Sequence, residues 1–283
     1  MLQPDSPNIG LPESPPDLGW AVDGPADAPA IVLVHGTRLT RAAWRAVADE
    51  LSGEFRVIAV DLPGHGARSS ESFSLYGAAS SIVDAIDAAG GGEALVVGHS
   101  LGGYVAMELV ARWPDRVRGL VLAGASQEPI GRWSLPYRLY AWTLGSSPLR
   151  LLDSLNTAFI RMRYDAHIAE PIVAAGDSSR AGMEAVRAIV NEPFLPRLAR
   201  YSGPVLLING EYDLIFRLGE RAFLRSVAGA RRRLIPGATH LVTLDRPEAF
   251  ATAVATFARG LPTRRAARTG PAEGAPQGPR GAR

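Results

Sequence analysis

The sequence predicts an α/β protein in which a mostly parallel central sheet is flanked by helices and interrupted by an inserted helical cap. Two observations favour this fold class. Short β-branched apolar runs that end in Gly, Asp or Asn alternate with longer helical patterns, as in successive strand and helix units. One long interval, 127–196, breaks this alternation and contains no convincing buried strand.

The alternating pattern defines strands and helices in chain order. Six apolar runs are predicted as strands, at 31–34, 56–60, 94–97, 119–122, 205–208 and 233–235. Helices are predicted at 41–52, 74–89, 101–113, 218–228 and 247–258. Thr40 and Pro247 supply start signals for two of these helices.

The interval 127–196 divides the predicted domain into two core parts, 19–126 and 197–261. It is rich in aromatic side chains, at Trp133, Tyr137, Tyr140, Trp142, Phe159 and Tyr164. These rings form either an ordinary core beneath the inserted helices or the cover of an apolar pocket. The two ends, 1–18 and 262–283, are rich in Pro, Ser, Gly and Arg, and their composition predicts disorder.

Composition excludes several kinds of chemistry. The 283 residues include no Cys, which rules out disulfides, cysteine nucleophiles, thiolate metal sites and iron–sulfur clusters. Every basic residue is Arg, so a lysine Schiff base and a P-loop lysine are excluded as well. We expect no cofactor and no metal.

The charge balance gives little support for a nucleic-acid partner. The net charge is +2, and the segment 262–283 has five Arg against one Glu, so the rest of the chain is close to −2. We therefore expect no nucleic-acid partner and no function for the Arg-rich end. Because no secretory pattern and no run of 18 apolar residues occurs, we also expect a cytoplasmic protein without a membrane partner.

The sharpest local signal is Gly98-His99-Ser100-Leu101-Gly102, which lies between a predicted strand and a predicted helix. A sharp turn in this position exposes a serine hydroxyl, and the flanking glycines let the backbones pass closely. The turn also directs the amide of Leu101 and the helix N-terminus at one point, where an oxyanion would form. Ser100 is thus the predicted nucleophile.

A serine nucleophile needs a histidine base, and five His are available. His240 is the best candidate because it lies on a loop between the last predicted strand and the last predicted helix. His99 lies inside the turn and points away from Ser100, while His167 lies in the predicted cap. Both are more typical of structural or surface histidines.

The base in turn needs a carboxylate that orients it. Asp213 follows the strand at 205–208, at the sheet edge where functional groups of open α/β sheets collect. Glu211 beside it and Glu128 after an earlier strand remain alternatives. The chain order is then Ser, Asp, His.

Together with His35-Gly36 and with Asp61-Leu62-Pro63-Gly64-His65-Gly66, the serine motif resembles the α/β-hydrolase superfamily over roughly residues 19–260. The resemblance implies that Thr37, which follows the His-Gly pair, donates one oxyanion-hole amide and that Leu101 donates the second. It gives His35 and His65 no proton-transfer role. Related epoxide hydrolases and haloalkane dehalogenases have Asp where this chain has Ser100, which argues against both activities.

These residues predict a serine hydrolase that cleaves a carboxylic ester of a small, moderately hydrophobic substrate. A thioesterase, a cofactor-free haloperoxidase or perhydrolase, and a carbon–carbon bond hydrolase would use the same triad. A non-catalytic small-molecule binding protein on the same fold is the alternative of another class. The oligomeric state is left open.

Overall fold

A computed structural model describes residues 17–146, 149–176 and 179–262. Its centre is a seven-stranded sheet in the order β1-β3-β2-β4-β5-β6-β7. All neighbouring strands are parallel except β1, which runs antiparallel to β3 at one edge. The strands are β1 (Trp20–Asp23), β2 (Ala30–Val34), β3 (Arg56–Val60), β4 (Ala94–His99), β5 (Val117–Ala123), β6 (Val205–Gly210) and β7 (Arg231–Ile235). The predicted fold class is confirmed.

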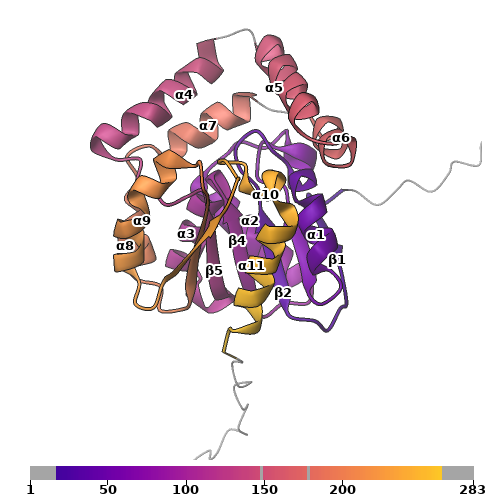
Figure 1. Cartoon of the computed structure of the whole chain (residues 1–283), viewed down its shortest axis with the longest axis vertical. Coiled ribbons are helices and arrows are strands. Elements are labelled where there is room, and N and C mark those ends of the chain that lie inside the picture. Colours follow the sequence, from indigo (N-terminus) through magenta and orange to yellow (C-terminus); the bar gives the residue numbers. More distant parts are fainter. Residues whose placement is uncertain (1–16, 147–148, 177–178, 263–283) are drawn as a thin grey trace, which may run out of the picture.

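Helices cover both faces of this sheet (Figure 1). Side chains alternate between the two faces along each strand, and both sets are buried, as in a doubly covered parallel sheet. In β2, Val32 and Val34 join the core cluster beneath α2 (Leu75–Ala88) and α3 (Leu101–Arg112). Ile31 and Leu33 join the opposite cluster beneath α1 (Arg45–Leu51) and α11 (Pro247–Arg259).

A block of helices lies between β5 and β6. It comprises η4 (Gly131–Trp133), α4 (Ser134–Ser146), α5 (Leu149–Arg163), α6 (Ala166–Ala174), α7 (Ser179–Ile189) and α8 (Phe194–Leu198). In Figure 1, α4 to α7 lie above the sheet, whereas α8 packs beside α3. The boundary expected at residue 196 falls within α8, and the division into two core parts and a cap stays a prediction.

Several elements differ from the sequence prediction. Strand β1 was missed because it is a four-residue edge strand with no buried apolar run. Helix α9 (Leu214–Ser226) begins at Leu214 rather than residue 218, directly after Asp213 at its N-cap. The region 41–52 divides into η1 (Arg41–Trp44) and α1, and two short 3₁₀ segments, η2 (Gly66–Arg68) and η3 (Pro114–Arg116), and α10 (Val242–Asp245) add single turns.

The predicted disordered ends fall outside the described residues, apart from residues 17, 18 and 262. Within the described ranges, no helix is both long enough and apolar enough to span a bilayer.

Candidate active site

The serine lies at the turn between β4 and α3. Its backbone has φ 51° and ψ −114°, a left-handed conformation that is uncommon for a residue with a side chain. Glycine is required at the two neighbouring positions because another part of the backbone passes close to each. A Cβ on Gly98 would lie 2.4 Å from the Gly102 carbonyl oxygen, and one on Gly102 would lie 2.2 Å from that of Val34. The sequence therefore folds into a tight turn that holds the Ser100 side chain out from the sheet edge.

The structure brings Ser100, His240 and Asp213 into one hydrogen-bonded chain. The Ser100 hydroxyl oxygen is 3.0 Å from His240 Nε2, and His240 Nδ1 is 2.9 Å from Asp213 Oδ2. With the proton on Nδ1, the imidazole donates to the carboxylate and leaves Nε2 to accept the serine proton. Asp213 is buried, while His240 is partly exposed.

A glycine makes room for this chain of side chains. Gly124, just after β5, has φ +55°, and a Cβ there would lie 2.9 Å from two ring atoms of His240 and 3.2 Å from Asp213 Oδ2. The amide of Gly124 donates to the buried side chain of Asn209. The His240 ring and the Asp213 carboxylate therefore lie directly against the backbone at position 124.

Phe216 covers one face of the His240 ring. The two rings are nearly parallel, with centroids 4.7 Å apart and planes inclined by 16°. Phe216 lies in the first turn of α9, three residues after Asp213, and its carbonyl accepts a hydrogen bond from Ser126 Oγ. The same helix thus begins with the carboxylate and then supplies the ring that packs on the imidazole.

Asp245 in α10 fixes the loop that contains His240. Its Oδ2 accepts hydrogen bonds from the amide of Thr239 at 2.7 Å and from the Thr239 hydroxyl at 2.6 Å. Its Oδ1 accepts from Arg163 Nη2 and from the Tyr164 hydroxyl, both at 2.9 Å. The carboxylate is fully buried, so it links the end of α5 to the histidine loop.

Tyr164 keeps its proton in this cluster. Burial, and then the neighbouring Asp245 carboxylate, raise the pKa of the Tyr164 hydroxyl well above its ordinary value. The phenol is therefore a hydrogen-bond donor to Asp245 throughout the ordinary pH range.

His99 supports the backbone of His240 rather than the proton transfer. Its Nε2 donates to the His240 carbonyl oxygen at 2.8 Å. Burial, and then the proximity of His240, lower the pKa of His99 to about 4, so the ring is neutral near pH 7. His35 and His65 are also buried, and their pKa values are lowered mainly by desolvation.

The alternative candidates for the base and the carboxylate lie elsewhere. Glu211 Oε2 accepts the amide of Gly237 at 2.9 Å, and Glu128 Oε1 accepts the amide of Leu195 at 2.8 Å. His167 is exposed on α6. Neither glutamate is the hydrogen-bond partner of His240.

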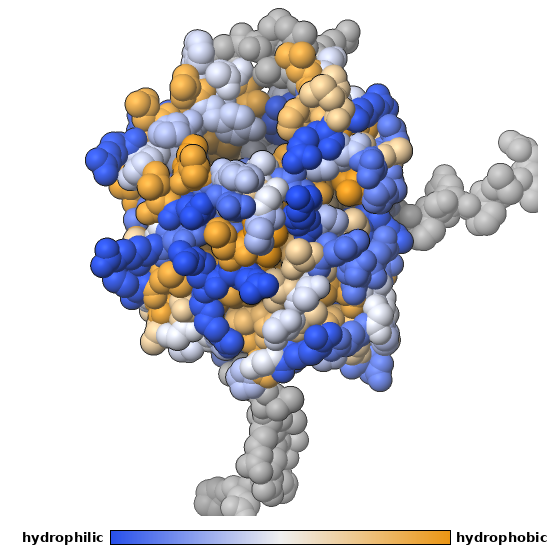
Figure 2. All heavy atoms as spheres, in the orientation of Figure 1, coloured by the Kyte–Doolittle hydropathy of each residue, from blue (hydrophilic) through white to orange (hydrophobic). Residues whose placement is uncertain are grey.

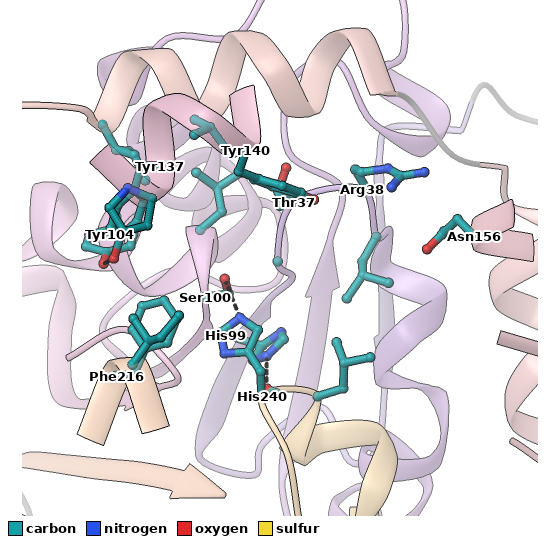
Figure 3. Close-up of a pocket in the computed structure, with 18 of the residues that line it drawn as sticks. Thr37, Arg38, His99, Ser100, Tyr104, Tyr137, Tyr140, Asn156, Phe216 and His240 are labelled. Carbon is teal, nitrogen blue, oxygen red and sulfur yellow. Dashed lines mark hydrogen bonds between the residues drawn. The ribbon is translucent and has the colours of Figure 1, made fainter. Parts of the chain in front are cut away.

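A cavity of about 380 Å³ opens over Ser100 (Figure 3). Thr37 and Leu101, the two expected oxyanion-hole residues, both line it, and Arg38 beside Thr37 has a left-handed backbone, φ 59°. The inserted helices supply much of the remaining wall. Aliphatic and aromatic side chains predominate in it: Leu39, Tyr104, Pro136, Tyr137, Tyr140, Ile160, Val186, Ile189, Ile215, Phe216 and Leu241.

Two phenols form one end of the cavity. The hydroxyls of Tyr104 and Tyr137 are 2.7 Å apart, and both donate toward the Gln127 carbonyl oxygen. Phe216 packs edge-on against Tyr137. Because the hydroxyls are held by the protein, this end presents mainly ring surface to a ligand.

The sequence analysis missed Phe216, Asp245 and Gly124. For Phe216 a signal exists, since a residue three positions after Asp213 in a helix shares its face. No local signal marks Asp245, whose partner Arg163 is 82 residues away. Among the described residues, no group of three or more His, Asp or Glu is arranged to hold a metal ion.

The fold and the serine turn define the class of protein. A model of the alpha/beta hydrolase family matches residues 31–253, and the chain belongs to this family.

Curated relatives of the chain include esterases. The chain is 29% identical over 244 residues to a pimeloyl-(acyl-carrier protein) methyl ester esterase of Nitrosomonas europaea, covering 81% of this chain and 95% of that protein. It is 31% identical over 253 residues to the enzyme of the same name from Neisseria meningitidis, covering 81% and 93%. A carboxylesterase of Bacillus subtilis is 27% identical over 248 residues, covering 84% and 82%.

Solved structures share the fold at lower identity. A thermophilic esterase from Thermogutta terrifontis superposes with a TM-score of 0.70 at 24% identity, covering 85% of this chain and 92% of that one. The enol-lactonase of Burkholderia xenovorans gives 0.72 at 23% identity, covering 85% and 95%. At these identities the likeness concerns the fold.

Proposed function

We propose that this α/β hydrolase is a carboxylic ester hydrolase that acts on a small, moderately hydrophobic ester through an acyl-enzyme on Ser100. The observation that carries the proposal is the pair of hydrogen bonds that joins Ser100 to His240 and His240 to Asp213, at 3.0 and 2.9 Å. The esterase relatives support ester cleavage as the reaction.

The geometry supports a two-step reaction. His240 Nε2 takes the proton as Ser100 Oγ attacks the ester carbonyl carbon, and the negative charge collects on the carbonyl oxygen. The amides of Thr37 and Leu101 stabilise that oxyanion. His240 then gives its proton to the leaving alcohol, which departs and leaves the acyl group on Ser100.

Water completes the turnover. His240 removes a proton from a water molecule that attacks the acyl-enzyme, and returns it to Ser100 as the acid leaves. Asp213 keeps Nδ1 protonated and stabilises the transient imidazolium. None of these steps requires a metal or an organic cofactor.

The cavity indicates the size and polarity of the substrate. A lining made mostly of aliphatic and aromatic side chains favours an ester with a moderately apolar acyl or alcohol group. The pinned hydroxyls of Tyr104 and Tyr137 support this, because they leave ring surface for the ligand. A small-molecule ester fits the volume of about 380 Å³.

Labelling with a fluorophosphonate tests the nucleophile. We expect one adduct, on Ser100, which is absent in Ser100→Ala and strongly reduced in His240→Ala. A folded protein that gives no adduct and hydrolyses no ester would favour a ligand-binding role.

A substrate panel separates ester cleavage from the other reactions that the same triad allows. Activated short-chain esters should be cleaved, and Ser100→Ala should lower their kcat by several orders of magnitude. The panel also includes acyl-thioesters, peroxide-dependent bromination and a coloured dienoate. Faster turnover of one of these would assign the thioesterase, haloperoxidase or carbon–carbon bond hydrolase reaction instead.

A further inference from the structure

Three helices that line the cavity also expose apolar side chains on their outer faces. In α4 and α5, three large apolar residues each recur at positions i, i+4 and i+7, the spacing of a single helix face. In α9 an exposed pair recurs at i and i+4. These eight residues, here called the apolar rim, are Leu135, Leu139, Trp142, Leu155, Phe159, Met162, Leu214 and Leu218.

The apolar rim lies on helices that also line the cavity. Tyr140 and Ile215 are exposed, each adjoins a rim residue in the sequence, and both line the cavity. Elsewhere the described residues expose few large apolar side chains. These are Leu18, Val22, Tyr76, Ile130 and Tyr212. In Figure 2, hydrophobic residues are visible at the surface in the upper part of the molecule, where Figure 1 shows α4 and α5, as well as in the middle of this face.

The exposed charges that the structure describes on these three helices have one sign. Arg138 is the only charged residue of α4. In α9 the exposed charges are Arg221 and Arg225, since Glu220 is buried. In the part of α5 whose side chains are described, 154–163, the two charged residues are Arg161 and Arg163. Both arginines of α5 are paired, Arg161 with Glu170 and Arg163 with Asp245. The positive charge beside the rim therefore comes from Arg138 of α4 and from Arg221 and Arg225 of α9, and no exposed acid occurs on these described stretches.

We propose that the apolar rim docks on an anionic lipid surface, with the cavity opening beside the lipid. Helices with Leu, Phe and Trp on one face and Arg nearby are suited to the boundary between headgroups and acyl chains. The apolar stripes leave water, and the arginines meet anionic headgroups. This peripheral contact goes beyond the proposed ester hydrolysis, and it is contrary to the sequence-based expectation of no membrane partner.

Other binding partners would match only part of the chemistry of this surface. If a second copy of the chain contacted this copy through the same face, Arg138 and Arg221 of one copy would approach the same arginines of the other, and the like charges would repel. An acidic soluble protein would satisfy the arginines but would have to cover three separate apolar stripes. An anionic lipid surface meets both requirements at once.

Vesicle co-sedimentation of the full chain tests the proposal. We expect binding to vesicles that contain phosphatidylglycerol, weaker binding to pure phosphatidylcholine, and release at high salt. Leu139→Asp and Phe159→Asp should each lower the partition coefficient roughly tenfold, because each removes one apolar side chain and adds an anion.

The control is Leu18→Asp, because Leu18 and Leu139 are equally exposed, at 58% and 57%, and Leu18 lies outside the rim. Leu18→Asp should bind vesicles as wild type does, and all three variants should hydrolyse a water-soluble activated ester at the wild-type rate. Absence of vesicle binding by the wild type would overturn the proposal. So would binding that Leu139→Asp leaves unchanged but deletion of 263–283 abolishes, or a dimer that Leu139→Asp dissociates without any binding to vesicles.

Discussion

The ring of Phe216 lies almost parallel to the imidazole of His240, at a centroid distance of 4.7 Å. Each nitrogen of the imidazole also makes a hydrogen bond. The stacked ring therefore fixes the plane of the imidazole, and the two hydrogen bonds fix its edges. In the proposed reaction His240 takes the serine proton, and the positive charge then lies over the face of the Phe216 ring, which attracts a cation. On that proposal, Phe216 orients the imidazole and stabilises its charged form.

Replacing Phe216 by Leu should slow catalysis without unfolding the protein. An aromatic stack contributes about 1 kcal/mol beyond its buried area, so kcat/KM for an activated ester should fall roughly fivefold. Phe216→Tyr keeps the ring and should retain most of the activity. Equal activity in Phe216→Leu and wild type would show that the stack plays no part in catalysis.

Gly124→Ala should separate backbone strain from damage to the site. A left-handed alanine costs about 1 kcal/mol of stability, and here its Cβ also lies 2.9 Å from the His240 ring. The displaced ring should lower kcat/KM about a hundredfold.

Gly229→Ala is the matched control for this variant. Gly229 has φ +75°, and a Cβ there would meet no atom within 4 Å. Urea unfolding should show a loss of about 1 kcal/mol in Gly229→Ala and at least as large a loss in Gly124→Ala. Esterase activity should fall only in Gly124→Ala. A comparable loss of activity in Gly229→Ala would mean that general destabilisation is the cause.

Asp245→Asn should affect both stability and turnover. The carboxylate accepts four hydrogen bonds, and an amide would leave Arg163 and Tyr164 facing a donor or would release Thr239. We expect a loss of about 2–3 kcal/mol in the free energy of unfolding and a clear fall in kcat, because Thr239 precedes His240. Tyr164→Phe, which removes one bond at the far oxygen, should lose about 1 kcal/mol and keep kcat. Equal kcat in Asp245→Asn and wild type would show that Thr239 does not need this anchor.

Much of the fold could be predicted because its central strands are buried on both faces. The runs in β2, β3 and β4 are therefore continuous and apolar, and they are easily recognised. Strand β1 is exposed on an edge and has no such run. Ser100, Asp213 and His240 were selected by their positions at strand ends, and the structure places them in contact, while their catalytic roles stay predictions.

The remaining contacts depend on segments far apart in the sequence. Asp245 and Tyr164 are 81 residues apart, so no local pattern indicates that they meet. The aromatic residues of the insertion were expected in a core or over a pocket. Tyr137 and Tyr140 line the cavity, but Trp142 and Phe159 are exposed. A helical period indicates which residues share a face, but it does not indicate whether that face meets protein, ligand or solvent.

Acid should destabilise the protein through its buried histidines. Burial lowers the pKa of His99 from 6.5 to about 4 in the folded state, so below pH 6.5 the unfolded chain binds a proton that the folded chain refuses. Stability is complete above about pH 6.5 and is lost as the pH falls toward 4, with a slope of up to about 1.4 kcal/mol per pH unit from this residue. His35 and His65 shift in the same direction.

Urea unfolding of the wild type and two variants across this window measures the contribution of His99. In His99→Gln, a neutral amide can still donate to the His240 carbonyl oxygen, and the decrease in stability between about pH 6.5 and 4 should be shallower. His167→Gln removes an exposed histidine and should follow the wild-type curve. If His99→Gln kept the full slope, the acid sensitivity would belong to other groups, because a side chain that cannot be protonated in either state contributes no linkage to pH.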